Sequence, residues 1–146
     1  MIDATLIVRK VNLISQDFKE IVELSRKSLQ EFLASRVDEV LAERYLERMI
    51  GRMIDINYHL ITESGFPPPT DYYPSFLQLE RLGILPHDLA QTIAACAGLR
   101  NRIVLEYDEI DPTRIHEALQ TAARDLPQYL TPVSYTHLTL PTKRIV

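Results

Sequence analysis

Tryptophan is absent from these 146 residues, and cysteine and glycine are scarce, with one Cys and four Gly. The single Cys96 cannot form an internal disulfide, which excludes the disulfide-stapled class of small secreted domains. Because Cys96 lies among alanine and leucine residues, we interpret it as a small core residue rather than a reactive thiol. Long apolar runs are also missing, since none approaches the roughly 18–20 residues of a membrane span.

The N-terminus lacks the pattern of a signal peptide, because Asp3 and Arg9 interrupt its apolar residues. The length is that of one domain with a core of its own. Together with the missing membrane span, these features predict a cytoplasmic single-domain protein, with no membrane as partner.

The C-terminal segment 133–146 differs from the rest of the chain, because it resembles the translation of a sequencing adapter. We therefore expect residues 1–132 to be the native domain and residues 133–146 to be a non-native tail. Excluding Lys143 and Arg144 of this tail from the 16 basic residues leaves 14 against 20 acidic ones, a net charge of −6. A globally basic surface for nucleic acid is therefore excluded, and any contact with RNA has to come from a local cleft.

Apolar residues repeat at alternating spacings of three and four, which predicts long amphipathic helices. A first helix of about thirty residues carries a stripe that begins at Ile7 and ends at Phe32. Gly65 and three following prolines end a second helix, and Asp111–Pro112 opens a fifth whose end we expect Pro127 to fray or kink. The remaining helices are expected over about 37–64, over 71–82 and from residue 86. The sequence thus predicts an all-α, up-and-down bundle of four to five helices.

Arg100 interrupts an apolar stripe of the fourth predicted helix, which runs from Leu89 to Tyr107. A charge on a buried face is costly unless a partner compensates it. The simplest partner is a carboxylate on a neighbouring helix, and Asp55 is the candidate. In that interpretation Arg100 has a structural role alone, and Tyr107 is an ordinary residue at the rim of the core.

The run Gly98-Leu-Arg-Asn-Arg-Ile-Val-Leu-Glu-Tyr107 resembles a known family signature: Arg-Asn, three residues, His, one residue, Tyr. This is the signature of HepT-like (DUF86) toxin ribonucleases of the HEPN superfamily. Arg100, Asn101 and Tyr107 match it, whereas Leu105 stands at the His position. Further segments resemble the family in the same order along the chain: 6–11, 53–59, 65–70, 82–86 and 107–112.

The resemblance implies a metal-independent endoribonuclease site without a cofactor, formed where two protomers pack together. Arg100 and Asn101 would be its catalytic residues, with Arg100 holding the scissile phosphate in its planar fork. The missing His would exchange protons with the 2′-hydroxyl or the leaving oxygen, giving a cyclic phosphate. Leu105 cannot transfer a proton, so the resemblance implies a homodimeric toxin acting on RNA with impaired activity.

The resemblance also implies a partner, an MntA-like nucleotidyltransferase antitoxin that silences such toxins by adding AMP to the motif tyrosine. Tyr107 matches this AMPylation acceptor, and a phosphate there would place negative charge near Arg100. An alternative is a non-catalytic dimeric helical module that only binds this partner.

A third and weaker hypothesis is a nucleotide-handling enzyme that uses Asp55 and His59. These two residues are four apart on the second predicted helix, where they can stack as a His–Asp pair. The simpler interpretation is that they pair on the helix surface. No cluster has the spacing of a metal site, and Asp55 and His59 alone supply too few ligands.

Overall fold

The computed structural model describes residues 1–106, 108 and 110–137, which form six helices and no strand. The helices are α1 (Ala4–Ser25), α2 (Leu29–Leu33), α3 (Arg36–Glu63), α4 (Tyr72–Arg81), α5 (His87–Leu105) and α6 (Pro112–Ser134). The prediction of an all-α fold is confirmed. None of these helices is both long and apolar enough to cross a membrane.

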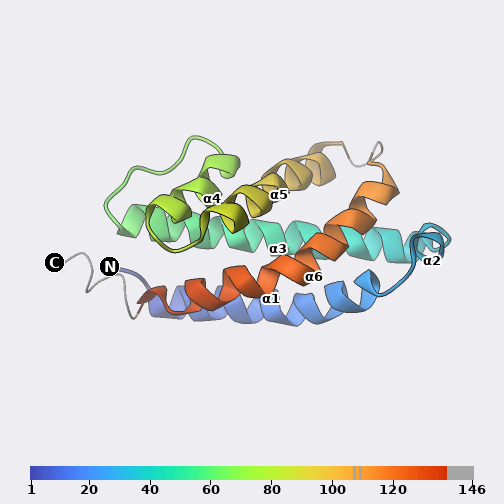
Figure 1. The fold of residues 1–146 in the computed structure, drawn as a ribbon, viewed down its shortest axis with the longest axis horizontal. Helices are drawn as coiled ribbons and strands as arrows, with labels where there is room; N and C mark the ends of the chain where they lie inside the picture. Colours follow the sequence, from blue (N-terminus) through green and yellow to red (C-terminus); the bar gives the residue numbers. More distant parts are fainter. Residues whose placement is uncertain (107, 109, 138–146) are drawn as a thin grey trace.

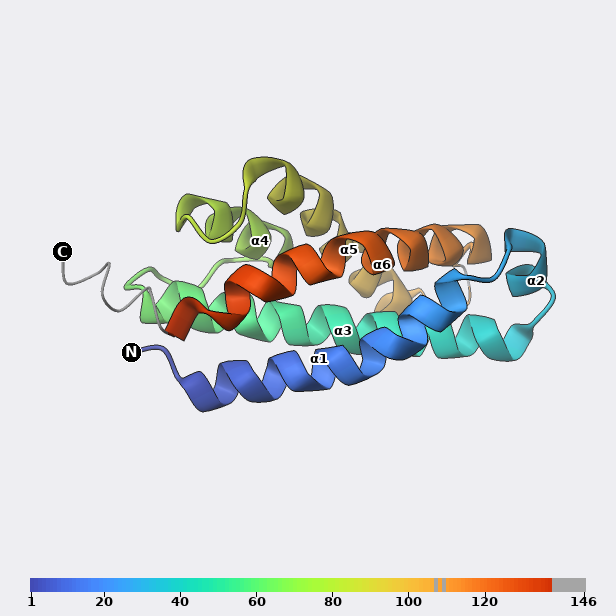
Figure 2. The same ribbon diagram turned by 60° about the horizontal axis from the view of Figure 1, so that its bottom comes forward.

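The four long helices alternate in direction along an up-and-down bundle (Figure 1). Helix α3 is the central element, because it packs against α1, α4, α5 and α6. In the view of Figure 1, α4 and α5 lie above α3, and α1 and most of α6 lie below it. The turned view of Figure 2 shows α1 running beside α3. The short α2 closes the end of the bundle where α1 turns into α3. This arrangement confirms the predicted up-and-down bundle. The short helix predicted over 71–82 is α4, and α2 is an additional short helix that was not predicted.

The predicted apolar stripes form the core. Ile7, Ile14 and Ile21 of α1 are fully buried, and so are Met53 and Leu60 of α3. All four residues of the stripe predicted on α6 are buried as well: Ile115, Leu119, Ala122 and Leu126. Each long helix therefore uses its apolar face inside this chain, as amphipathic helices of a bundle do.

The first predicted helix is broken. Helix α1 ends at Ser25, and α2 begins three residues after Arg26 caps it. Ser28 starts α2 through a capping box, in which its side chain accepts the N–H of Glu31 and the Glu31 carboxylate accepts the N–H of Ser28. This reciprocal pairing satisfies two free N–H groups at once and starts a new helix within the continuous apolar stripe. Phe32 still reaches the core and is fully buried.

Helix α6 continues to Ser134 although Pro127 and Pro132 lie inside it. The frayed end expected at Pro127 is therefore not observed. Each proline removes one hydrogen bond of the helix and costs roughly 3 kcal/mol in a helix interior. Tyr129 and Val133, which follow Pro127 by two and six residues, are fully buried. Their packing against the bundle offsets the loss and keeps the last two turns helical.

Candidate functional site

The C-terminal half of α5 carries the motif residues. The apolar face of α5 as a whole is buried at Leu89, Ile93 and Ile103, and Arg100 lies on the same face. Arg100 is half-buried, and its Nε atom has no exposed surface and no hydrogen-bond partner within the described part of the chain. The charge on an apolar stripe that the sequence showed is thus a real feature of the fold.

Two neighbours hold the guanidinium group of Arg100. Its Cζ atom lies 5.3 Å from the centre of the Tyr72 ring, which is within the range of a cation–π interaction. Its Nη1 donates a long hydrogen bond of 3.5 Å to Oδ1 of Asn101, the next residue. No carboxylate pairs with Arg100 among the described residues. The Nη N–H donors that Asn101 does not use therefore stay available for an anion such as a phosphate.

Arg100 opens onto a surface groove of about 370 Å³ between α3, the start of α4 and α5, which we call the Arg100 groove. Most of its lining comes from α3. The residues that line it are Arg44, Glu47, Arg48, Gly51, Arg52, Ile54, Asp55, Tyr72 and Arg100. Four arginines against two carboxylates make it a local basic cleft in a chain of acidic net charge. Such a cleft concentrates anions without a basic surface elsewhere.

The arginines of α3 in this groove differ from Arg100 in having acidic partners. Arg48 and Arg52 both bind the same oxygen of Asp17 on α1, at 3.1 and 2.9 Å. Arg44 pairs with Glu47 one turn away, at 3.2 Å. Among the described residues, Arg100 is thus the arginine of the groove whose charge no carboxylate neutralises.

The two residues of α3 considered in the sequence have partners on α1 and its cap. Asp55 lines the Arg100 groove but pairs with Lys10 at 2.8 Å. His59 accepts the backbone N–H of Asp3 through Nε2 at 2.8 Å. Neither an Asp55–Arg100 nor an Asp55–His59 bond occurs in the described part of the structure. Both side chains thus tie α1 to α3.

Leu105 is the last residue of α5, and its side chain is 76% exposed. It lies five positions after Arg100, which places the two side chains about 140° apart around the helix. They therefore flank a site rather than share one flat face. Tyr107, the predicted AMPylation acceptor, lies outside the described residues.

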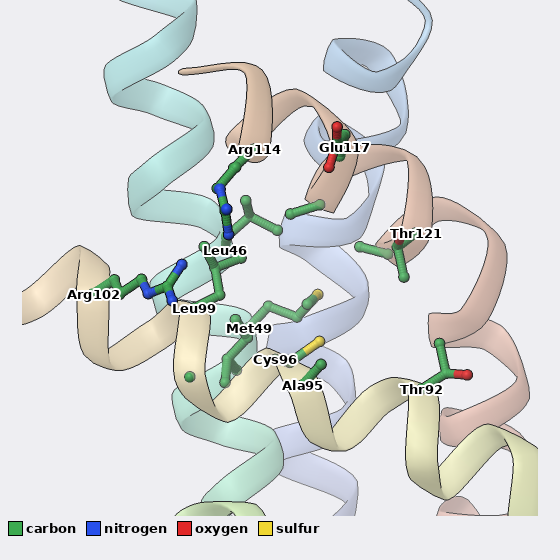
Figure 3. Close-up of a pocket in the computed structure, with 14 residues that line it drawn as sticks. Leu46, Met49, Thr92, Ala95, Cys96, Leu99, Arg102, Arg114, Glu117 and Thr121 are labelled. Carbon is green, nitrogen blue, oxygen red and sulfur yellow. The ribbon is translucent and has the colours of Figure 1, made fainter. Parts of the chain in front are cut away.

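A second groove of about 380 Å³ lies between α3, α5 and α6 (Figure 3). Figure 3 shows Cys96 and Met49 in its middle, with Arg102 and Arg114 on one side. Burial, with a smaller contribution from Asp125, raises the pKa of the Cys96 thiol to about 11, so it stays protonated and unreactive near neutral pH. Arg100, Asn101 and Leu105 do not line this groove. In the part of the chain that the structure describes, no three His, Cys, Asp or Glu side chains lie close enough together to bind a metal ion.

Sequence reasoning missed Tyr72 and Asp17, the residues that organise the arginines. Tyr72 lies 28 positions before Arg100 and belongs to no motif. Asp17 is a buried acid within the apolar helix α1. A cationic partner for Asp17 could have been predicted, because a buried carboxylate requires one. Which residue is that partner could not have been predicted, since it depends on how α1 packs on α3.

Comparison with known proteins extends these observations. The family model described as Ribonuclease HepT-like matches residues 14–133. A relative named tRNA nuclease HepT, from Aphanizomenon flos-aquae (strain 2012/KM1/D3), is 30% identical over 139 residues, which cover 95% of each chain.

Two solved structures share the fold. One is the tri-AMPylated Shewanella oneidensis HEPN toxin in complex with MNT antitoxin, which superposes with a TM-score of 0.78 at 21% identity and covers 88% of this chain and 96% of that one. The other is a tyrosine-to-alanine mutant of the toxin–antitoxin MntA–HpeT, with a TM-score of 0.77, 20% identity and coverage of 88% and 97%.

Proposed function

The chain belongs to the ribonuclease HepT-like family, and we propose that it is the toxin of a toxin–antitoxin pair, an RNA endonuclease with impaired proton transfer. The relative's name, tRNA nuclease, supports RNA as the substrate and tRNA as its first candidate. The toxin–antitoxin complexes of the same fold support the pairing with an antitoxin.

The environment of Arg100 is the main structural support for this proposal. A half-buried guanidinium without a carboxylate partner, at the wall of a basic groove, fits a phosphodiester better than a structural ion pair. The interpretation in which Arg100 only pairs with Asp55 lacks support, because Asp55 binds Lys10 instead. Asn101 contributes by accepting from the Arg100 fork.

Leu105 limits the chemistry. A histidine at this exposed position would titrate near its usual pKa of about 6.5, where it can both accept and donate a proton. Such acid–base help contributes roughly 10²–10⁴-fold to a rate. Without it the chain keeps the phosphate-binding half of the site and lacks the half that transfers protons.

The test is the Leu105→His variant, incubated with tRNA beside the wild type and Leu105→Gln. Because residue 105 is exposed, none of these changes disturbs the core. Of the three proteins, we expect only Leu105→His to cleave tRNA faster than the wild type, by roughly 10²–10⁴-fold, and to leave a 2′,3′-cyclic phosphate. Adding Arg100→Ala should abolish the gain. If Leu105→His is no faster than Leu105→Gln while both variants keep the helical content and the oligomeric state of the wild type, the alternative of a non-catalytic module that binds a nucleotidyltransferase is favoured.

Tyr107 is proposed as the acceptor of AMP from an MntA-like nucleotidyltransferase. The proposal is supported by the AMPylated state of the Shewanella toxin and by the tyrosine-to-alanine mutant of MntA–HpeT. Intact-mass measurement after incubation with such an enzyme and ATP should show added AMP on the wild type and none on Tyr107→Phe. Equal labelling of both proteins would move the acceptor elsewhere.

A homodimer is also proposed. The apolar stripes of α1 and α3 are buried within the chain, so a dimer surface has to lie elsewhere. Exposed apolar side chains remain on the N-terminal half of α3 and at the end of α5: Val37, Val40, Leu41, Val104 and Leu105. We propose that these residues contribute to the dimer surface, because contiguous exposed apolar surface marks interaction sites. Light scattering should report a dimer at micromolar concentration and a monomer for Val40→Asp, whereas a monomeric wild type would refute the composite site.

A further inference from the structure

We propose that Tyr72 is a positioning residue for Arg100: its ring fixes the guanidinium at the wall of the Arg100 groove in the orientation that receives a phosphate. The proposal rests on the phosphate-binding role proposed for Arg100. It assigns a role to a residue of α4 that lies far from the motif in sequence.

The contact between the two side chains explains how a charge is tolerated on this face. Arg100 Nε is buried without a hydrogen-bond partner among the described residues, a situation that is normally costly. The Tyr72 ring centre lies 5.3 Å from the guanidinium carbon and offers the negative face of its π system to the cation. The ring thus compensates the charge without occupying the N–H donors, as a carboxylate would.

Tyr72 is itself held on several sides. Asp71 accepts the N–H of Tyr72 at 2.7 Å as the cap of α4, and Ser75 Oγ donates to the Tyr72 carbonyl at 2.7 Å. The ring of Tyr58 meets the Tyr72 ring edge-on, with centres 6.1 Å apart, and the Tyr58 hydroxyl donates to the carbonyl of Pro69 at 3.2 Å. Through these contacts the proline-rich loop before α4 holds the Tyr72 ring in one orientation against α5.

A fixed guanidinium binds phosphate more tightly than a mobile one. An arginine side chain has many rotamers, and binding has to select one of them. The ring makes this selection before RNA arrives, which is preorganisation of the site. A different role for the ring, direct stacking on a base of the RNA, would help binding without Arg100. The experiment has to separate these two roles.

Two rings of nearly the same shape provide the perturbation. Tyr72→Phe keeps the π face, whereas pentafluorophenylalanine at position 72 reverses the charge distribution of the ring. Each protein is mixed with a short fluorescein-labelled single-stranded RNA, and affinity is read by anisotropy at fixed salt, since salt changes such affinities. We expect Phe to bind like the wild type and the fluorinated ring to bind about 3- to 5-fold more weakly, or about 0.7–1 kcal/mol.

The same pair of rings in the Arg100→Ala background completes the cycle. The difference between them should vanish there, because the ring acts through Arg100. Equal affinity of the two rings with Arg100 present overturns the proposal. A difference that persists after Arg100→Ala also overturns it and assigns direct base stacking to the ring.

A measurement without RNA keeps this proposal distinct from the proposed function. The Nε–H resonance of Arg100 should shift between Tyr72→Phe and the fluorinated variant, and an unchanged resonance would show that the ring does not fix the group. If Arg100→Ala binds RNA as well as the wild type, the phosphate role of Arg100 is refuted. The resonance then decides the contact with Tyr72 by itself.

Discussion

The hydroxyl group of Tyr129 joins three helices through one buried chain of hydrogen bonds. On α6, Tyr129 donates to Asn57 Oδ1 of α3 at 2.6 Å, and Asn57 Nδ2 donates to Ser75 Oγ of α4 at 3.1 Å. All three residues are completely buried. Burial raises the pKa of the Tyr129 phenol well above its usual value, so it remains a donor at any physiological pH.

Tyr129→Phe removes this donor and leaves the rest of the ring in place. The Asn57 amide oxygen then stays buried without its partner, and an unsatisfied buried polar group costs about 1–3 kcal/mol. The ring volume is kept, so no cavity is added to this cost. We expect the free energy of unfolding to fall by about 2 kcal/mol, which corresponds to a decrease in Tm of roughly 6 °C for a chain of this length.

Urea unfolding followed by circular dichroism measures this change. Tyr73→Phe is the matched control, because Tyr73 is exposed and its substitution should stay within about 0.5 kcal/mol of the wild type. If Tyr129→Phe also stays within that margin at an unchanged m-value, the buried chain does not hold α6, α3 and α4 together, and the reasoning is wrong.

Three further outcomes are expected. Asp17→Ala should destabilise the fold by about 3 kcal/mol in urea unfolding, because it leaves two arginines of α3 without their buried partner, whereas a loss below 1 kcal/mol would refute the role of this pair. The pKa of His87 is raised, first by its hydrogen bond to Glu80 and then by the charge of Glu80. This contact therefore stabilises the fold fully below about pH 6.5, and the stabilisation is lost as the pH rises through the folded pKa. The pKa of His87 measured by NMR titration should lie above 6.5 and should be lower in Glu80→Gln. Ending the chain at Pro132 should cost about 2 kcal/mol in urea unfolding through the loss of the fully buried Val133, whereas an unchanged free energy of unfolding would show that Val133 does not contribute to the core.

The helices were readable from the sequence because their signals are local. Apolar periodicity placed α3 and α6 within a residue or two of their observed starts, and caps such as Asp111 marked where a helix begins. The break between α1 and α2 was also encoded locally, by the capping box from Ser28 to Glu31. The continuous apolar stripe concealed it, since a stripe records which face is buried and not whether the backbone is continuous.

The candidate site was only half readable. Arg100 on an apolar stripe was evident from spacing along one helix, and Leu105 at the His position was evident from the resemblance to the family signature. The partner of Arg100 was not, and the carboxylate that the sequence suggested, Asp55, pairs with Lys10 instead. Pairing between charges depends on which helix faces lie within about 4 Å, and no spacing along one helix specifies that distance.

What the sequence by itself determined is therefore the set of helices, their buried faces and the residues that mark the family, including the leucine at the position of the proton-transfer residue. The tertiary structure decided that Asp17 holds two arginines of α3, that an aromatic ring compensates Arg100, and that Leu105 lies exposed. The physical reason is that helix formation follows from neighbours three and four residues apart. The environment of a charge follows from the packing of segments distant in sequence, here Tyr72 of α4 on Arg100 of α5.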